Sequence, residues 1–78
     1  MDKESILINV QNIFRDVLDD DSIVLSTETT ATDIGEWDSL THIQLVVAIE
    51  KYFKLRFSSK EISNWKNVGE MLDSIAKK

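Results

Sequence analysis

Gly35-Glu36-Trp37-Asp38-Ser39-Leu40 is the segment around which the predicted fold is organised. Asp38 is a residue type that caps helix N-termini, and apolar residues recur behind it at helical spacing as far as Phe53. Ser39 therefore opens a helix. An anion attached to Ser39 would lie at the positive end of the helix dipole, beside backbone N–H groups that have no partner inside the helix. The position suits a covalently held phosphate.

The helix predicted over Ser39–Phe53 is more apolar than one buried face requires. Its main apolar stripe and the residues that widen it are Leu40, Ile43, Val46, Ile49 and Phe53, with Leu45 and Val47. The excess predicts a helix that is buried on one side and contacts protein partners on another. The residues expected on the partner-binding side are Leu40, Gln44, Val47 and Glu50.

Working outward toward the N-terminus, an amphipathic helix is predicted over residues 3–18. Its apolar face consists of Ile6, Leu7, Val10, Ile13, Phe14, Val17 and Leu18. It should end before or within Asp19-Asp20-Asp21, because carboxylates are unfavourable at the negative end of a helix dipole. A long loop then runs to Trp37, and we expect its own side chains to pin it. Residues 23–25 are not read as a strand, since no second run is present to pair with them.

Toward the C-terminus, two further helices are predicted from capping-box spacing. Ser58 and Glu61 announce a short helix that runs through Ile62 toward Asn64. The stretch Asn67-Val68-Gly69-Glu70 opens the last helix, whose apolar face is Val68, Met71, Leu72 and Ile75. The predicted fold is all-α, a small bundle of three main helices plus one short helix, with a long loop between the first two. Residues 1–78 are expected to form one domain.

Composition excludes several classes of protein. The chain of 78 residues has no Cys, so it offers no disulfide framework and no thiolate metal site, and any thiol chemistry must be imported. The longest uninterrupted apolar run, residues 45–49, is far too short to span a bilayer, and the N-terminus lacks the apolar region of a signal peptide. We expect a soluble cytoplasmic protein without membrane insertion.

The net charge of −5 is unevenly distributed. Residues 16–38 contain eight carboxylates and no Lys or Arg, whereas Lys and Arg outnumber carboxylates from residue 39 onward. An acidic half of this kind repels a polyphosphate backbone, and the basic residues are not interleaved with aromatics. The pattern argues against nucleic acid and favours a basic protein partner.

Asp38-Ser39-Leu40 and the periodic residues behind it resemble the attachment site of acyl carrier proteins. The resemblance covers nearly all 78 residues, because the acidic loop, Gly35, the short capped helix and Asn67-Val68-Gly69 follow in the same order. It implies that Ser39 carries a covalent 4'-phosphopantetheine arm derived from coenzyme A, whose terminal thiol holds an acyl group as a thioester. One departure is that two residues separate Gly35 from Asp38, where the most familiar members have one.

The resemblance also implies partners. A phosphopantetheinyl transferase attaches the arm, an acyl-loading ligase or transferase supplies the cargo, and synthase or acyltransferase enzymes receive it. Asp38, besides capping the helix, would help to position the magnesium-bound coenzyme A phosphate during attachment. The chain itself would be a monomer and a carrier rather than an enzyme.

A specialised pathway of lipid or secondary-metabolite biosynthesis is expected rather than general fatty-acid synthesis. Fatty-acid carriers typically show a run of carboxylates on this helix, whereas Glu50 is its only internal carboxylate here. The polar positions are instead Thr41, His42, Gln44, Lys51 and Tyr52. Charges on a docking face set encounter rates and partner choice, so their absence should weaken docking to a fatty-acid synthase.

Other interpretations remain open at this stage. The alternative is an unmodified helical adaptor that binds a partner through the helix over residues 39–53, with Ser39 merely a first-turn serine. A Ser39/His42 esterase is disfavoured, because no nucleophile elbow surrounds the serine, and His42 reads as a solvated polar-face residue. Asp19-Asp20-Asp21 does not fit an EF-hand, so no metal site is predicted. Trp37 and Trp65 read as core or loop anchors.

Overall fold

Four α-helices and one short 3-10 turn make up the fold of residues 2–78, the part of the chain that the computed structural model describes. The elements are α1 (Lys3–Val17), η1 (Ala31–Asp33), α2 (Ser39–Phe53), α3 (Ser59–Asn64) and α4 (Val68–Ala76). No strand occurs among these residues. The all-α prediction of three main helices and one short helix is therefore confirmed, while η1 was not predicted. Its signal is the pair Thr30 and Asp33, which form a capping box around it.

The first helix begins and ends where local chemistry dictates. Asp2 caps α1 through a hydrogen bond of 2.8 Å from the Ser5 backbone N–H to its carboxylate. The helix ends at Val17, and Asp19 then adopts the left-handed conformation with φ of 52°. Aspartate tolerates this region better than most residues, so the predicted stop at the aspartates is confirmed.

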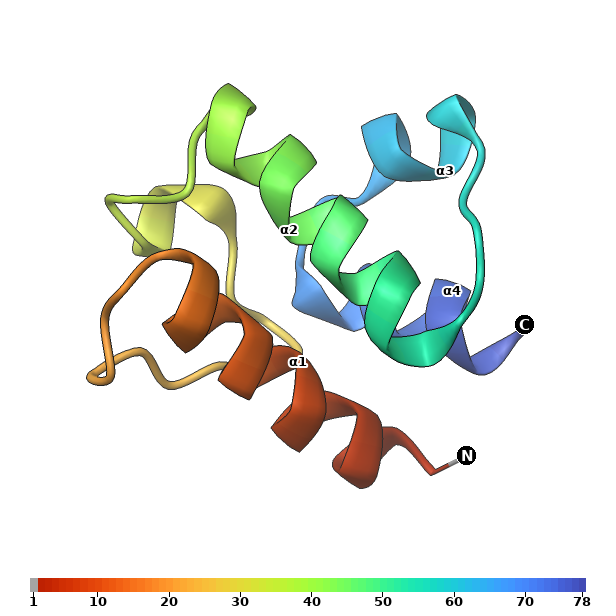
Figure 1. Cartoon of the computed structure of the whole chain (residues 1–78), viewed down its shortest axis with the longest axis horizontal. Helices are drawn as coiled ribbons and strands as arrows, with labels where there is room; N and C mark the ends of the chain where they lie inside the picture. The colour runs from red at the N-terminus through yellow and green to blue at the C-terminus, as the bar shows by residue number, and fades with distance from the viewer. Residues whose placement is uncertain (1) are drawn as a thin grey trace.

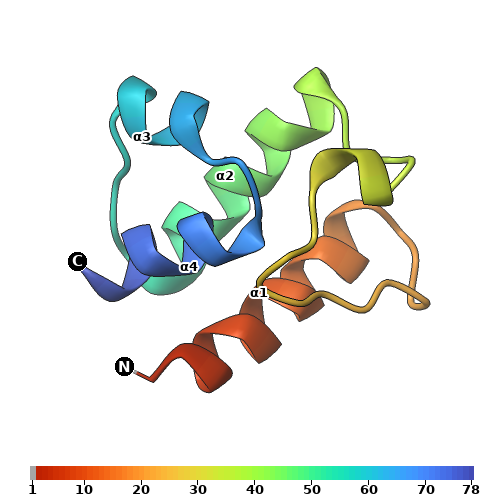
Figure 2. The same ribbon diagram turned by 180° about the vertical axis from the view of Figure 1, so that it is seen from behind.

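Helices α1, α2 and α4 enclose the core. Figure 1 shows α2 crossing the molecule with α1 below it, and Figure 2 shows α4 beside α1 from behind; α1 packs on both α2 and α4. The side chains with no exposed surface are Ile6, Val10, Phe14, Leu45, Ile49, Val68, Met71, Leu72 and Ile75. Lys3 at the start of α1 forms an ion pair with Asp73 of α4, so the beginning of α1 lies beside α4.

The long loop is pinned by its own side chains, as predicted, and also by neighbouring helices; within the loop, the Ser26 backbone N–H donates to Thr29 Oγ1 at 2.8 Å. Gln11 of α1 accepts a hydrogen bond of 2.9 Å from the Leu25 backbone, and Arg15 Nε donates one of 2.8 Å to the Ile23 carbonyl. Ile23 and Leu25 are thereby buried, while Val24 between them is exposed. As predicted, residues 23–25 form no strand.

Gly69 allows the loop to approach the start of α4. Its backbone N–H donates to the Thr27 carbonyl at 2.8 Å, and the Val68 N–H donates to the Thr29 carbonyl at 2.9 Å. A Cβ at position 69 would lie 2.8 Å from the Thr27 oxygen, closer than side chains tolerate. The close contact therefore requires glycine.

The predicted buried stripe of α2 was wrong at its first turns. Leu40 and Ile43 are 69% and 54% exposed. The inward positions follow helical spacing, but the first of them is His42 in place of Ile43, and they continue through Leu45, Val46, Ile49 and Phe53. The reason is that His42 finds a hydrogen-bond partner inside, so the apolar Ile43 faces outward. The prediction that His42 is a solvated polar-face residue was likewise wrong, because the residue is half-buried.

Candidate functional site

The start of α2 is held by a reciprocal set of hydrogen bonds. Asp38 Oδ1 accepts from the backbone N–H groups of Leu40 and Thr41, at 3.0 and 2.9 Å. Thr41 Oγ1 accepts from the Asp38 N–H at 2.8 Å and donates to the Glu36 carbonyl at 2.7 Å. The predicted cap at Asp38 is confirmed. The role of Thr41 was missed, although its position three residues after the cap is the signal of a capping box.

Ser39 is the first residue of α2 and is exposed. The sequence predicted unpaired backbone N–H groups beside Ser39, but three of them are already bonded. Those of Leu40 and Thr41 donate to the Asp38 carboxylate, and that of His42 donates to the Asp38 carbonyl at 2.8 Å. A phosphate on Ser39 therefore gains from the helix dipole rather than from these amides. Because the capping bonds fall on Oδ1, Asp38 Oδ2 is left for other ligands.

The Asp38 carboxylate is stabilised in its charged form. The hydrogen bond from the Thr41 backbone N–H, above all, holds the pKa of the Asp38 carboxyl below its ordinary value. Because the pKa of the Asp38 carboxyl is lower in the folded state than in the unfolded state, the charged cap contributes fully to stability at neutral pH. Its contribution is lost as the pH falls through that lowered pKa.

Asp38→Ala is expected to lower the urea concentration at the unfolding midpoint, because it leaves the Leu40 and Thr41 amides without their partner. Asp38→Asn keeps a capping oxygen without the charge, so it should remain closer to wild type at pH 7. It should also lose less stability than wild type between about pH 5 and pH 2. Urea titrations followed by circular dichroism across this range measure both effects. An identical pH dependence in wild type and Asp38→Asn would contradict the charged cap.

A hollow of about 520 Å³ opens beside Ser39, between α2 and α3. Its lining consists of Ala31, Trp37, Asp38, Ser39, His42, Ile43, Ile62, Ser63, Trp65 and Lys66. Trp37 Nε1 donates a hydrogen bond of 3.0 Å to His42 Nδ1, and the two rings are stacked with centroids 5.9 Å apart. The Trp65 ring meets His42 edge-on at 6.1 Å. An aromatic wall therefore borders the hollow next to the serine.

The same contacts argue against a nucleophilic serine. Because Trp37 Nε1 donates to His42 Nδ1, the lone pair of that nitrogen is used and the neutral ring carries its proton on Nε2. A ring held in this way has no free lone pair with which to accept the Ser39 proton. His42 is thus a half-buried structural residue.

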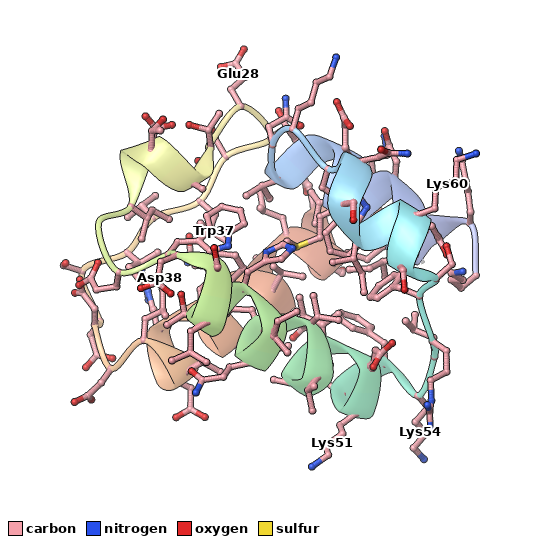
Figure 3. All side chains as sticks on the ribbon, turned by 90° about the horizontal axis from the view of Figure 1, so that it is seen from above. Glu28, Trp37, Asp38, Lys51, Lys54 and Lys60 are labelled. Atoms are coloured by element: carbon pink, nitrogen blue, oxygen red, sulfur yellow. The ribbon has the colours of Figure 1, made fainter. Side chains whose placement is uncertain are left out.

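The two tryptophans are anchors, as predicted. Trp37 is 8% exposed and packs edge-on against Phe14 in the core, with centroids 5.0 Å apart. Trp65 packs on Phe57 and donates from Nε1 to Ser74 Oγ at 2.8 Å. Figure 3 shows Trp37 and Asp38 as neighbours at the start of α2, so the residue before the cap ties the candidate attachment site to the core.

The residues expected to bind partners do not all share one environment. Leu40, Gln44 and Val47 are exposed on the side of α2 that faces away from the core. Glu50 is half-buried, and its Oε2 accepts a hydrogen bond of 2.9 Å from the Phe57 backbone. The only carboxylate inside α2 is therefore already engaged within the protein.

Two properties of residues 2–78 bear on metal binding and on membranes. In this part of the chain, no group of three or more His, Cys, Asp or Glu side chains is arranged to hold a metal ion. Nor does any helix there have the length and apolar character needed to cross a membrane.

Comparison with known proteins agrees with this geometry. The family model described as phosphopantetheine attachment site matches residues 9–75. The family model and the all-helical fold together define the class of this chain, a small helical domain that bears a phosphopantetheine arm. An acyl carrier protein of Acidothermus cellulolyticus is 34% identical over 76 residues, covering 97% of this chain and 90% of the relative.

Among solved structures, the holo acyl carrier protein of Geobacter metallireducens superposes with a TM-score of 0.87 at 49% identity. The match covers 92% of this chain and 83% of that one. The chain belongs to the acyl carrier protein family. Its covalent cofactor is phosphopantetheine, and it is a carrier that works with synthase and transferase enzymes rather than an enzyme itself.

Proposed function

We propose that Ser39 is the residue that bears the 4'-phosphopantetheine arm, within a carrier domain formed by residues 1–78. The observation that carries this proposal is the exposed position of Ser39 as the first residue of α2, beside the hollow and fixed by the Asp38 cap. The residues present fit the arm, since nothing covers the serine within residues 2–78 and the positive end of the helix dipole favours a phosphate.

The arm supplies the thiol that the chain lacks, because the sequence contains no Cys. An acyl group is held on it as a thioester and is presented to biosynthetic enzymes. The chain's own contribution is to bind the enzymes and to hold the arm at a defined point. Tethering makes the meeting of cargo and docked enzyme effectively intramolecular.

The test is the intact mass of the purified protein after incubation with coenzyme A and a broad-specificity phosphopantetheinyl transferase. The expected result is the addition of one phosphopantetheine group, which peptide mapping then places on Ser39. An unmodified mass under conditions that convert another acyl carrier protein would favour the alternative of a helical adaptor.

Asp38 is proposed to act in arm attachment as well as in capping. Its Oδ1 caps α2, and Oδ2 is left to help position the magnesium-bound coenzyme A phosphate. Asp38→Asn keeps the cap and removes the charge, so it should slow arm attachment and weaken its dependence on magnesium. Unchanged transfer kinetics across magnesium concentrations would leave Asp38 with the cap alone.

The cargo is proposed to belong to a specialised pathway rather than to general fatty-acid synthesis. The supporting observation is the outward side of α2, where Leu40, Gln44 and Val47 are exposed and carry no charge. The one internal carboxylate, that of Glu50, accepts a bond from the Phe57 backbone. This surface offers little to a basic docking patch.

A reconstituted fatty-acid synthase should therefore elongate an acyl chain on this arm-loaded protein more slowly, at low salt, than an acyl chain on the general fatty-acid carrier. Gln44→Glu with Lys51→Glu should restore part of the rate, because both positions are exposed on α2. Thr41 stays unchanged, since it belongs to the cap of Asp38. Asn12→Glu with Lys77→Glu is the matched control, with the same change in net charge elsewhere on the surface. Equal elongation of the two unaltered carriers would contradict the proposal.

A further inference from the structure

A second hollow, of about 450 Å³, lies at the C-terminal end of α2. We call it the basic hollow; its lining residues are Val47, Glu50, Lys51, Lys54, Leu55 and Arg56. Figure 3 shows Lys51 and Lys54 extending outward from this end of α2, far from Asp38 at the other end. Three cationic side chains thus surround one hollow, at the end of the helix opposite to Ser39.

The cations of the basic hollow have no ionic partner within the described part of the chain. Among residues 2–78, ion pairs join Lys3 to Asp73 and Lys78 to Glu61, and none involves Lys51, Lys54 or Arg56. The carboxylate within the hollow, that of Glu50, accepts a hydrogen bond from the Phe57 backbone. All three cationic residues are exposed, so the hollow presents an excess of positive charge.

Lys54 lies at a position whose backbone conformation favours glycine. It is the C-cap of α2 and adopts the left-handed conformation with φ of 57° and ψ of 50°. Glycine is the usual residue at such a position, because a Cβ makes the left-handed region less favourable. Lys54 therefore keeps a side chain at a position where glycine would be less strained, and its positive charge is favourable at the C-terminal end of the helix dipole.

An exposed surface leads from the attachment site to the basic hollow. Leu40, Gln44, Val47 and Lys51 follow one another at spacings of four, three and four residues, which places them on one side of α2. Leu40 is 69% exposed and Val47 is 43% exposed. The outward side of α2 is therefore apolar near Ser39 and cationic at its far end.

We infer that an enzyme that uses the loaded arm, docked on the outward side of α2, also binds the basic hollow and presents carboxylates to Lys51, Lys54 and Arg56. The inference rests on the proposed function of Ser39. Apolar contact at Leu40 and Val47 supplies affinity, while the cations select an acidic partner and set its orientation. The acidic residues 16–38 lie toward the opposite end of α2, so a partner docked in the reverse direction meets repulsion.

An anionic membrane fits the same charges less well. Recognition of lipid headgroups typically uses about four to eight clustered Lys and Arg residues, whereas the basic hollow has three. The eight carboxylates of residues 16–38 would also be repelled by an anionic surface. Charge complementarity therefore favours a protein surface of limited acidic area.

The test titrates the ¹⁵N-labelled, arm-loaded protein with an amphipathic helical peptide of Leu and Glu. A peptide with Lys in place of Glu and vesicles of anionic phosphatidylglycerol are run in parallel. The acidic peptide is expected to shift the amide signals of residues 47–57, and high salt should weaken its binding. Lys51→Glu/Lys54→Glu/Arg56→Glu should weaken binding about tenfold, as expected for three exposed ion pairs.

The matched control is Lys60→Glu/Lys66→Glu/Lys77→Glu, which changes the net charge equally but lies outside the basic hollow. Its affinity for the acidic peptide should be at least about half that of the wild type. Lys54→Gly separates the effect on binding from the effect on folding. It should raise the unfolding midpoint, because glycine adopts the left-handed conformation without strain, and it should weaken binding of the acidic peptide, because the charge of Lys54 is removed.

Three results would overturn the inference: no shifts at residues 47–57 with the acidic peptide, equal loss of affinity in both triple variants, or binding of the vesicles in preference to the peptide. Each variant is also incubated with coenzyme A and a transferase. Failure of the wild type to gain its arm counts against the proposed function, whereas full arm attachment with absent docking counts only against the basic hollow.

Discussion

Ser39→Ala should lose all phosphopantetheine attachment while its circular dichroism and unfolding midpoint remain close to those of wild type. The hydroxyl is the group to which the arm would be joined, and Ser39→Ala leaves no hydroxyl on the exposed first residue of α2. The fold should persist because the cap is formed by Asp38 and Thr41, not by Ser39. Intact mass after incubation with coenzyme A and a transferase measures the loss.

The chain contains its own matched control for this experiment. Ser59 is also an exposed first residue of a helix, and Ser58 with Glu61 forms a capping box before it, as Asp38 does before Ser39. Ser59→Ala should gain one arm as efficiently as wild type. Attachment of an arm to Ser39→Ala, or its loss in Ser59→Ala, would show that the assignment of Ser39 is wrong.

Trp37→Ala should destabilise the fold by about 3–5 kcal/mol, the usual cost of truncating a large buried aromatic residue. Trp37 is 8% exposed, packs edge-on against Phe14 and donates to His42 Nδ1. Removal opens a cavity and leaves the His42 nitrogen without its donor. Since domains of this size are stable by only about 5–15 kcal/mol, this loss is a large share of the free energy of folding.

Urea unfolding followed by circular dichroism measures this effect. Trp37→Phe keeps an aromatic ring against Phe14 but loses the hydrogen bond to His42, so a smaller loss of about 1–3 kcal/mol is expected. Val24→Ala is the control, because Val24 is 74% exposed and its truncation should change stability by less than about 0.5 kcal/mol. A midpoint for Trp37→Ala equal to that of Val24→Ala would contradict the anchoring role.

The position of Trp37 also links folding to the site. It lies immediately before the cap, and the Trp37 N–H donates to the Ile34 carbonyl at 3.1 Å in a turn that exposes Gly35 and Glu36. Of the two residues between Gly35 and Asp38, Glu36 is the exposed residue of the turn and Trp37 is the buried aromatic residue. The start of α2 is held against the core by that aromatic.

The positions of the helices were determined by the sequence alone, because their signals are local. Helical spacing of apolar residues identified α1, α2 and α4, and the caps at Asp38 and Ser58 placed two of the helix starts. These hydrogen bonds join groups no more than three residues apart, so any folded state that contains the helix contains them. Asp38-Ser39-Leu40 also identified the family by resemblance, which the comparisons confirm.

Tertiary structure alone decided which residues of α2 face the core and which face outward. Periodicity gives the spacing of a stripe but not its starting residue, and hydrophobicity favoured Ile43 over His42. His42 lies inward because Trp37 and Trp65, the latter 23 residues away in the sequence, supply a donor and an aromatic neighbour. Glu50 is likewise engaged by the backbone of Phe57, seven residues on. Such partners are brought together only by packing, because a buried polar group is stable wherever the fold provides its hydrogen bond.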